Sequence, residues 1–197
     1  MIWTIVLIVA IAPSTGLASE KLTVMLDWFV NPDHGPLIVA QQKGFFKDAG
    51  LDVELIAPAD PNDPPKLVAA GKADIAVSYQ PQLVVQVAAG LPLARIGTLV
   101  ATPLNSLVVL ADGPVHSIGD LRGRKVGFSV GGFEDALLSA MLRRYGLGLD
   151  DISLVNVNFS LSPSIVSGQV DAVIGAFRNF ELNQMDIVGH PGRAFYV

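Results

Sequence analysis

Four aromatic residues stand just past the ends of expected strands, where their rings can point into a shared cleft. These residues are Trp28, Tyr79, Phe133 and Phe177. A flat heteroaromatic ligand needs apolar faces of this kind and a few directed hydrogen bonds. The four rings therefore predict a site that binds a neutral ring by stacking. Core packing is the competing interpretation for each ring, because aromatic residues at strand ends often pack inside.

Four polar side chains near these rings can supply the hydrogen bonds. Asn31 carries a donor and an acceptor on one amide, which match adjacent ring nitrogen and amino groups. Glu181 can accept from an exocyclic amino group, His34 can bond a substituent, and Asn105 is a further polar candidate. The alternatives are structural. Asn31 can simply serve the turn at Pro32, His34 can cap a helix, and a helical glutamate can lie on a solvated face.

Two stretches far apart in the chain repeat nearly the same pattern. One is 71–77 (Gly-Lys-Ala-Asp-Ile-Ala-Val) and the other is 168–174 (Gly-Gln-Val-Asp-Ala-Val-Ile). Each combines a helix-terminating glycine, a polar turn and a short apolar strand that ends near an aromatic ring. The sequence therefore predicts an α/β fold of two similar lobes, 20–105 and 106–197, each a mostly parallel sheet flanked by helices. A ligand cleft is expected between the lobes.

Apolar periodicity and the positions of glycine and proline predict the individual elements. The expected strands cover 21–27, 51–56, 71–77, 95–101, 106–111, 125–130, 152–157, 172–175 and 194–197. The expected helices cover 36–43, a short stretch up to 70, 81–89, 133–145, 162–167 and 179–185. Four prolines make 57–65 a loop. Gly131-Gly132 predicts a turn through which the backbone can approach a ligand closely.

Composition and the amino terminus indicate an exported protein. The 197 residues are 51% hydrophobic, carry a net charge of −5 and include no cysteine. The apolar run Ile5–Ala12 and the small residues at 16–18 predict a signal peptide over 1–18, with a buried strand as the alternative. Without a cysteine to carry a lipid, we expect a periplasmic monomer that has no lipid anchor. The few, scattered basic residues argue against a nucleic-acid partner, and three histidines show no metal-ligand spacing.

Two stretches carry a resemblance to a known family. They are 26–34 (Leu-Asp-Trp-Phe-Val-Asn-Pro-Asp-His) and 40–53, which contains Gly-Phe-Phe-Lys-Asp-Ala-Gly-Leu-Asp-Val. The chain resembles the thiamine pyrimidine precursor family, which contains periplasmic pyrimidine-binding proteins of ABC importers and a related pyrimidine synthase. The resemblance continues through 71–79, 120–127 and 168–181. It therefore covers nearly everything after the predicted signal peptide.

This resemblance implies a type II periplasmic binding fold and a binding protein that is not an enzyme and needs no cofactor. Its ligand would be a thiamine pyrimidine precursor (a hydroxymethyl- or aminomethyl-pyrimidine), delivered to permease and ATPase subunits of an ABC transporter. In that fold the chain returns to the first lobe after the second. Because the expected strand 194–197 has no helix after it, we expect a truncated chain that lacks this return segment.

Two other functions stay open. The related synthases build the pyrimidine from pyridoxal phosphate and a histidine of their own, with iron. They carry a lysine just past the strand that matches 74–77 and a histidine four residues later, and Ser78 and Gln82 hold those places here. A serine cannot form the Schiff base that a lysine amine forms. An importer protein for a sulfonate or nitrate is the other alternative, because a fold does not determine its ligand.

Overall fold

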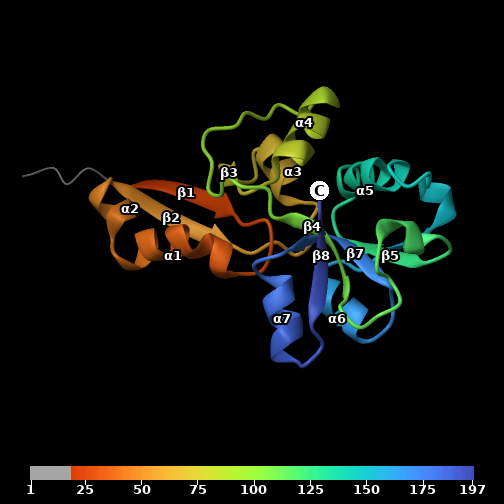
Figure 1. The fold of residues 1–197 in the computed structure, drawn as a ribbon. Coiled ribbons are helices and arrows are strands. Elements are labelled where there is room, and N and C mark those ends of the chain that lie inside the picture. Colours follow the sequence, from red (N-terminus) through yellow and green to blue (C-terminus); the bar gives the residue numbers. More distant parts are fainter. Residues whose placement is uncertain (1–18) are drawn as a thin grey trace, which may run out of the picture.

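The computed structural model describes residues 19–197, and the predicted signal peptide lies outside the described residues. The described chain forms two sheets flanked by helices (Figure 1). Residues 19–104, here called the N-terminal segment, carry a three-stranded sheet, and residues 105–197, the C-terminal segment, carry a five-stranded sheet. This architecture has the predicted α/β class. Within 19–197, no helix is both long and apolar enough to cross a membrane.

The sheet of the N-terminal segment is parallel. β1 (Glu20–Met25) lies between β2 (Leu51–Ile56) and the two-residue β3 (Ile75–Ala76). The helices are η1 (Pro32–His34), α1 (Gly35–Gln42), α2 (Phe45–Asp48), α3 (Pro64–Ala69) and α4 (Gln80–Ala88). A proline stands at the first or second position of α1, α3 and α4, where a missing backbone N–H removes no intrahelical bond.

The sheet of the C-terminal segment has the order β6-β5-β7-β4-β8. Its strands are β4 (Asn105–Leu110), β5 (Lys125–Phe128), β6 (Ser153–Asn156), β7 (Ala172–Phe177) and β8 (Gly192–Tyr196). β4 is antiparallel to both β7 and β8, and the other pairs are parallel. The helices are η2 (Ile118–Leu121), α5 (Glu134–Arg143), η3 (Leu149–Asp151), α6 (Leu161–Val166) and α7 (Glu181–Ile187).

Two adjacent inner strands of this sheet, β4 and β7, are buried on both faces, which explains their continuous apolar sequences. Leu107 and Val109 of β4 face one apolar cluster, whereas Val108 and Val173 face the other. The second cluster also contains Trp28, which comes from the N-terminal segment. The two segments therefore share part of one core.

A β-bulge interrupts β7 at Gly175. Leu107 pairs with Ile174 and Ser106 pairs with Ala176, so Gly175 has no partner on β4. One extra residue moves every later side chain to the opposite face of a strand. Ala176 consequently lies in the same cluster as Val173, although their spacing is odd. The bulge thereby changes the direction in which the last residues of β7 point.

The repeated pattern forms the same local structure in both segments. Gly71 and Gly168 have φ of +67° and +73°, which favour glycine at a helix end. Three residues later, Asp74 Oδ2 accepts the N–H of Thr23 at 2.7 Å, and Asp171 Oδ2 accepts the N–H of Lys125 at 2.9 Å. Each aspartate thus ties the turn to the backbone of a neighbouring strand, β1 in one case and β5 in the other.

Most expected elements occur within one to three residues of their predicted bounds, and one does not occur. Residues 95–101 were expected to be a strand, but they form neither helix nor strand. In the described chain they pair with no other strand, and Ile96 is 78% exposed. An apolar run forms a strand only where a partner supplies hydrogen bonds, so the local pattern misled the prediction.

Candidate functional site

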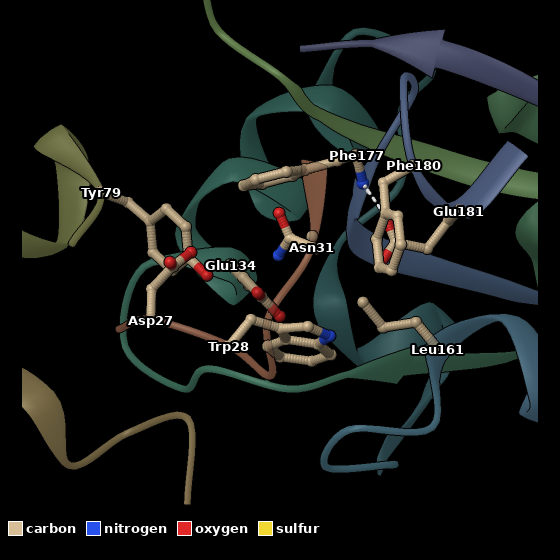
Figure 2. A pocket seen from close by; sticks show the side chains of 10 residues that line it. Asp27, Trp28, Asn31, Tyr79, Glu134, Leu161, Phe177, Phe180 and Glu181 are labelled. Atoms are coloured by element: carbon tan, nitrogen blue, oxygen red, sulfur yellow. Dashed lines mark hydrogen bonds between the residues drawn. The ribbon is translucent and has the colours of Figure 1, made fainter. Parts of the chain in front are cut away.

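A small cavity lies where residues just past β1 and β3 face the end of β7 (Figure 2). Its free volume is about 10 Å³, close to the room that one water molecule needs. Both segments line it, with Asp27, Trp28, Asn31, Tyr79, Glu134, Leu161, Gly175, Phe177, Phe180 and Glu181. The carboxyl ends of strands in α/β folds are where ligands usually bind.

Aromatic rings of the two segments contact one another at and beside this cavity. Trp28 and Phe159 have ring centroids 4.7 Å apart in an edge-to-face arrangement. The ring of Tyr79 lies 5.1 Å from that of Phe133 and 5.9 Å from that of Phe177. Tilted and edge-to-face contacts of this kind are favourable for aromatic pairs. Since the rings already occupy the space between the segments, a pyrimidine enters only if side chains or segments move apart.

Glu134, the first residue of α5, places a buried carboxyl group at the cavity. Its Oε2 accepts the N–H of Ser129 at 2.8 Å and the N–H of Val130 at 3.1 Å. Burial raises the pKa of Glu134 to about 8 against the effect of these two hydrogen bonds, and the charges of Asp135 and Glu181 raise it further. Near neutral pH this carboxyl group is therefore mostly protonated.

Glu181, the first residue of α7, provides a second buried carboxyl group. Its Oε2 accepts the N–H of Phe177 at 2.6 Å, which is the dashed line in Figure 2. Burial raises the pKa of Glu181 to about 7, and the negative charges of Asp33 and Asp27 act in the same direction. The charge of this group therefore changes close to neutral pH.

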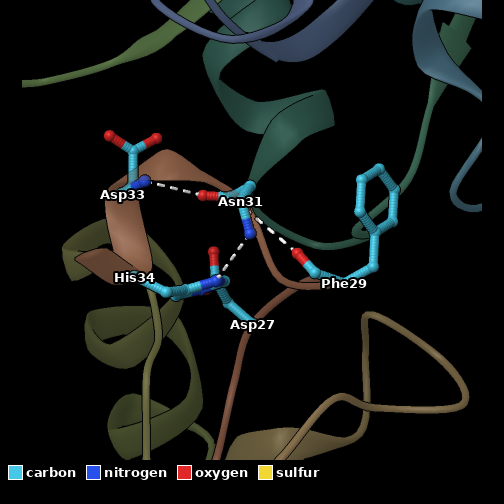
Figure 3. A network of polar contacts seen from close by, with 5 residues as sticks. All are labelled: Asp27, Phe29, Asn31, Asp33 and His34. Carbon is cyan, nitrogen blue, oxygen red and sulfur yellow. Dashed lines mark hydrogen bonds and ion pairs between the residues drawn. The ribbon is translucent and has the colours of Figure 1, made fainter. Parts of the chain in front are cut away.

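A third acidic side chain, Asp27, is hydrogen-bonded to a buried histidine, His34 (Figure 3). His34 Nε2 lies 2.7 Å from Asp27 Oδ1, and His34 Nδ1 accepts the N–H of Asn31 at 3.2 Å. Because Nδ1 accepts, the proton of a neutral ring sits on Nε2 and is donated to Asp27. Asn31 also caps η1, because its Oδ1 accepts the N–H of Asp33 at 2.9 Å. The loop after β1 is therefore held by its own polar side chains.

Tyr79 brings a phenol to the same group of side chains. Burial raises its pKa well above the usual value, and the charge of Asp27 together with a hydrogen bond to it acts in the same direction. The phenol is therefore neutral and can donate to Asp27 or to a ligand. Tyr79 precedes α4, so its position depends on β3 and the start of that helix.

The predicted site residues separate into two groups. Trp28, Asn31, Tyr79, Phe177 and Glu181 line the cavity, whereas Phe133, His34 and Asn105 do not. Phe133 packs beside Tyr79, and His34 lies behind Asp27. Asn105 donates from Nδ2 to the carbonyl of the bulge residue Gly175 at 3.4 Å. All eight residues thus lie at or next to one site, and their role in ligand binding remains a prediction.

Sequence reasoning missed half of the cavity lining. The lining residues that it did not select are Asp27, Glu134, Leu161, Gly175 and Phe180. Asp27 carried a usable signal, because it is a lone carboxylate at the end of an apolar strand and next to Trp28. Glu134 falls in the first turn of the expected helix 133–145, where an acidic side chain usually stays in solvent. Leu161 and Gly175 have no local signal, because only the bulge and the packing of α6 bring them to the cavity.

The cavity offers several acceptors and no cation. Asp27, Glu134 and Glu181 are acidic, and none of the described residues that line the cavity is lysine or arginine. One donor of the lining, the buried Trp28 Nε1, has no partner among the described residues. Buried carboxyl groups and an unpaired indole N–H need hydrogen-bond partners, and the described lining offers no cation for an anionic group. No cluster of residues suited to a metal ion occurs within 19–197.

Two solved structures of periplasmic or alkanesulfonate-binding proteins share this fold. The periplasmic aliphatic sulphonate binding protein SsuA of Escherichia coli matches with a TM-score of 0.65 and 19% identity, over 89% of this chain and 59% of its own. The alkanesulfonate-binding protein SsuA of Xanthomonas axonopodis pv. citri matches with a TM-score of 0.68 and 17% identity, over 89% and 60%. The chain therefore has the predicted type II periplasmic binding fold.

The chain belongs to the NMT1/THI5-like family, which matches residues 31–197 and confirms the resemblance seen in the sequence. A Haemophilus influenzae protein whose name refers to thiamine biosynthesis is 63% identical over 91% of this chain and 57% of its own. The formylaminopyrimidine-binding protein of Halalkalibacterium halodurans is 37% identical over 88% and 52%. A 4-amino-5-hydroxymethyl-2-methylpyrimidine phosphate synthase of Aspergillus parasiticus is 32% identical over 81% and 46%. The chain spans about half the length of the curated relatives it matches.

Proposed function

We propose that this protein is the periplasmic substrate-binding component of an ABC importer and captures a thiamine pyrimidine precursor. The observation that carries this proposal is the cavity in which aromatic rings surround three carboxyl groups. Amino groups of a hydroxymethyl- or aminomethyl-pyrimidine would donate to oxygen atoms of the carboxyl groups, and its ring would stack on the aromatic faces. Trp28 Nε1 would donate to a ring nitrogen or a hydroxyl oxygen.

Ligand capture would open and close the cavity. The rings of the two segments contact each other in the present arrangement, so the pyrimidine would replace these ring contacts when it enters. The predicted lobes, 20–105 and 106–197, would move as rigid bodies about the chain that crosses between them near 102–106. The closed, loaded protein, a monomer, would then deliver its ligand to the permease and its ATPase.

The synthase is the second candidate, because several fungal relatives carry that name. Pyridoxal phosphate would need a lysine for its Schiff base and cations for its phosphate. Ser78 holds the expected position of that lysine, and its Oγ donates to Gln82 Oε1 at 2.7 Å. Neither residue can form an imine. Addition of pyridoxal phosphate is therefore expected to produce no visible absorbance band from bound cofactor, and such a band would favour the synthase.

The charge of the ligand distinguishes the pyrimidine from the sulfonate alternative. We expect calorimetry to show binding of hydroxymethylpyrimidine and binding of its phosphate that is at least roughly 100-fold weaker. The physical reason is that a phosphate or sulfonate would enter a site that is lined by three carboxyl groups and has, among its described lining, no cation to neutralise the ligand. An alkanesulfonate serves as the second test ligand. Tighter binding of the phosphate or the sulfonate than of the free alcohol would contradict the proposal.

Trp28→Phe tests the buried indole donor. The substitution retains a flat ring against Phe159 but removes the N–H, so we expect the Kd for hydroxymethylpyrimidine to rise by about 5- to 10-fold. Trp28→Ala is less informative, because Trp28 is only 6% exposed and packs in a core cluster. Calorimetry gives the affinity, and the unfolding midpoint checks that the fold persists. An unchanged Kd would show that the indole N–H does not contact the ligand.

A further inference from the structure

Asn62 joins the two segments through both ends of its side-chain amide. Its Nδ2 donates to the carbonyl of Ser129 at 3.1 Å, and its Oδ1 accepts the N–H of Gly131 at 3.1 Å. Asn62 lies in the proline-rich loop before α3, 69 residues from Gly131 along the chain. One amide therefore pairs with a backbone donor and a backbone acceptor of the same turn. We call these two hydrogen bonds the Asn62 clasp.

Hydrogen bonds within the loop also orient the side-chain amide of Asn62. Asp60 Oδ1 accepts the backbone N–H of Asn62 and one Nδ2 hydrogen, both at 2.8 Å. The hydrogen bond from the Asn62 backbone is the main cause that lowers the pKa of Asp60, so this acceptor remains ionised. An aspartate that bonds the backbone two residues ahead is a local turn motif and requires no contact from the other segment.

The turn that the clasp holds is also the turn that positions Glu134. Ser129 and Val130 donate their N–H groups to the Glu134 carboxyl group, and Asn62 binds the carbonyl of Ser129 and the next N–H, at Gly131. The Gly131-Gly132 turn was expected to approach a ligand. The N–H of Gly131 bonds Asn62, so this turn contacts the other segment.

We propose that Asn62 is a positioning residue whose clasp stabilises the closed arrangement of the two segments and thereby raises the affinity of the site for its ligand. Each clasp bond exists only while the loop at 57–65 lies against the turn at 129–131. A protein that closes over a ligand gains affinity from any contact made only in the closed state. The affinity part rests on the proposed function, whereas the effect on closure does not.

Spin labels on either side of the clasp test its effect on closure. The chain has no native cysteine, so Lys66→Cys and Ala136→Cys would carry the only two labels. Both positions are exposed, one in α3 and the other in α5. Pulsed dipolar spectroscopy on the ligand-free protein is expected to give a longer mean distance in Asn62→Ala than in the parent. Asn62→Asp, which has no donor for the Ser129 carbonyl, should also lengthen it.

The matched control is Gln169→Ala, which removes a side-chain amide that bonds only within the C-terminal segment. This variant should retain the parent distance. If Asn62→Ala does not fold, as judged by circular dichroism, Asn62→Asp decides the question. Identical distance distributions in the parent and in every folded Asn62 variant would overturn the proposal.

Calorimetry with hydroxymethylpyrimidine tests the second half of the proposal. Loss of the two clasp bonds is expected to raise the Kd about tenfold in Asn62→Ala, with no change in Gln169→Ala. A longer distance with an unchanged Kd would overturn the link to affinity. If the parent itself does not bind the pyrimidine, the proposed function fails, and the spin-label distances still decide whether the clasp holds the segments together.

Discussion

Gly175→Ala is expected to lower the free energy of unfolding by about 3–5 kcal/mol, measured by urea denaturation. Gly175 has φ of +93°, and an added Cβ would lie 2.5 Å from Glu134 Cδ. The alanine would therefore strain the backbone and push the buried carboxyl group away from the N–H groups of Ser129 and Val130. Leaving those buried groups unpaired is the larger part of the cost.

Two comparisons separate the clash from the backbone strain. Gly146→Ala changes a glycine with φ of +69° that has no atoms within 4 Å of an added Cβ. It should cost only about 1 kcal/mol. In a Glu134→Ala background the obstructing carboxyl group is gone, so Gly175→Ala should cost clearly less there than in the parent. An equal loss of stability in both backgrounds would show that Glu134 does not explain the need for glycine.

The free energy of unfolding is expected to fall as pH rises through neutrality, by an amount on the order of 6 kcal/mol between pH 5 and pH 9. Burial raises the pKa of Glu134 to about 8 and that of Glu181 to about 7, from an ordinary value of 4.5. The folded state therefore binds these protons more tightly than the unfolded state. Their stabilising contribution is complete below pH 4.5 and is lost as pH rises through 7 and 8.

Paired glutamine variants test the origin of this pH dependence. Glu134→Gln/Glu181→Gln retains the acceptor oxygens but cannot ionise, so its unfolding free energy should change little between pH 5 and pH 9. Glu54→Gln, which alters an exposed glutamate on β2, should retain the decline of the parent. Urea denaturation at pH 5, 7 and 9 provides the comparison. A decline of equal size in the double variant would assign the effect to other groups.

Local sequence patterns predicted much of the fold. Apolar periodicity and the neighbouring glycines predicted the strand β2 at 51–56 and the helix α5. The repeated Gly-x-x-Asp pattern predicted two similar units, and each aspartate makes the same hydrogen bond to a neighbouring strand. The expected strand at 95–101 failed because pairing partners lie outside the window that a local pattern can describe.

Only part of the site could be predicted from the sequence. Aromatic residues past strand ends, such as Trp28, Tyr79 and Phe177, could be selected because chain position alone brings strand ends to one edge. The buried carboxyl group of Glu134 could not be anticipated, because helices often begin with a glutamate that stays in solvent. Its burial depends on Gly175, which is 41 residues away and lacks the Cβ that would exclude it.

By itself, the sequence determined the α/β class, the repeated unit, and the family to which the chain belongs. These properties depend on periodicity, turn residues and short motifs, all of which act over a few neighbouring residues. The tertiary structure alone decided that three carboxyl groups share one cavity, that the bulge at Gly175 admits one of them, and that Asn62 spans the two segments. Each of these depends on distances between residues far apart in the chain, and such distances are set only when the two segments pack together.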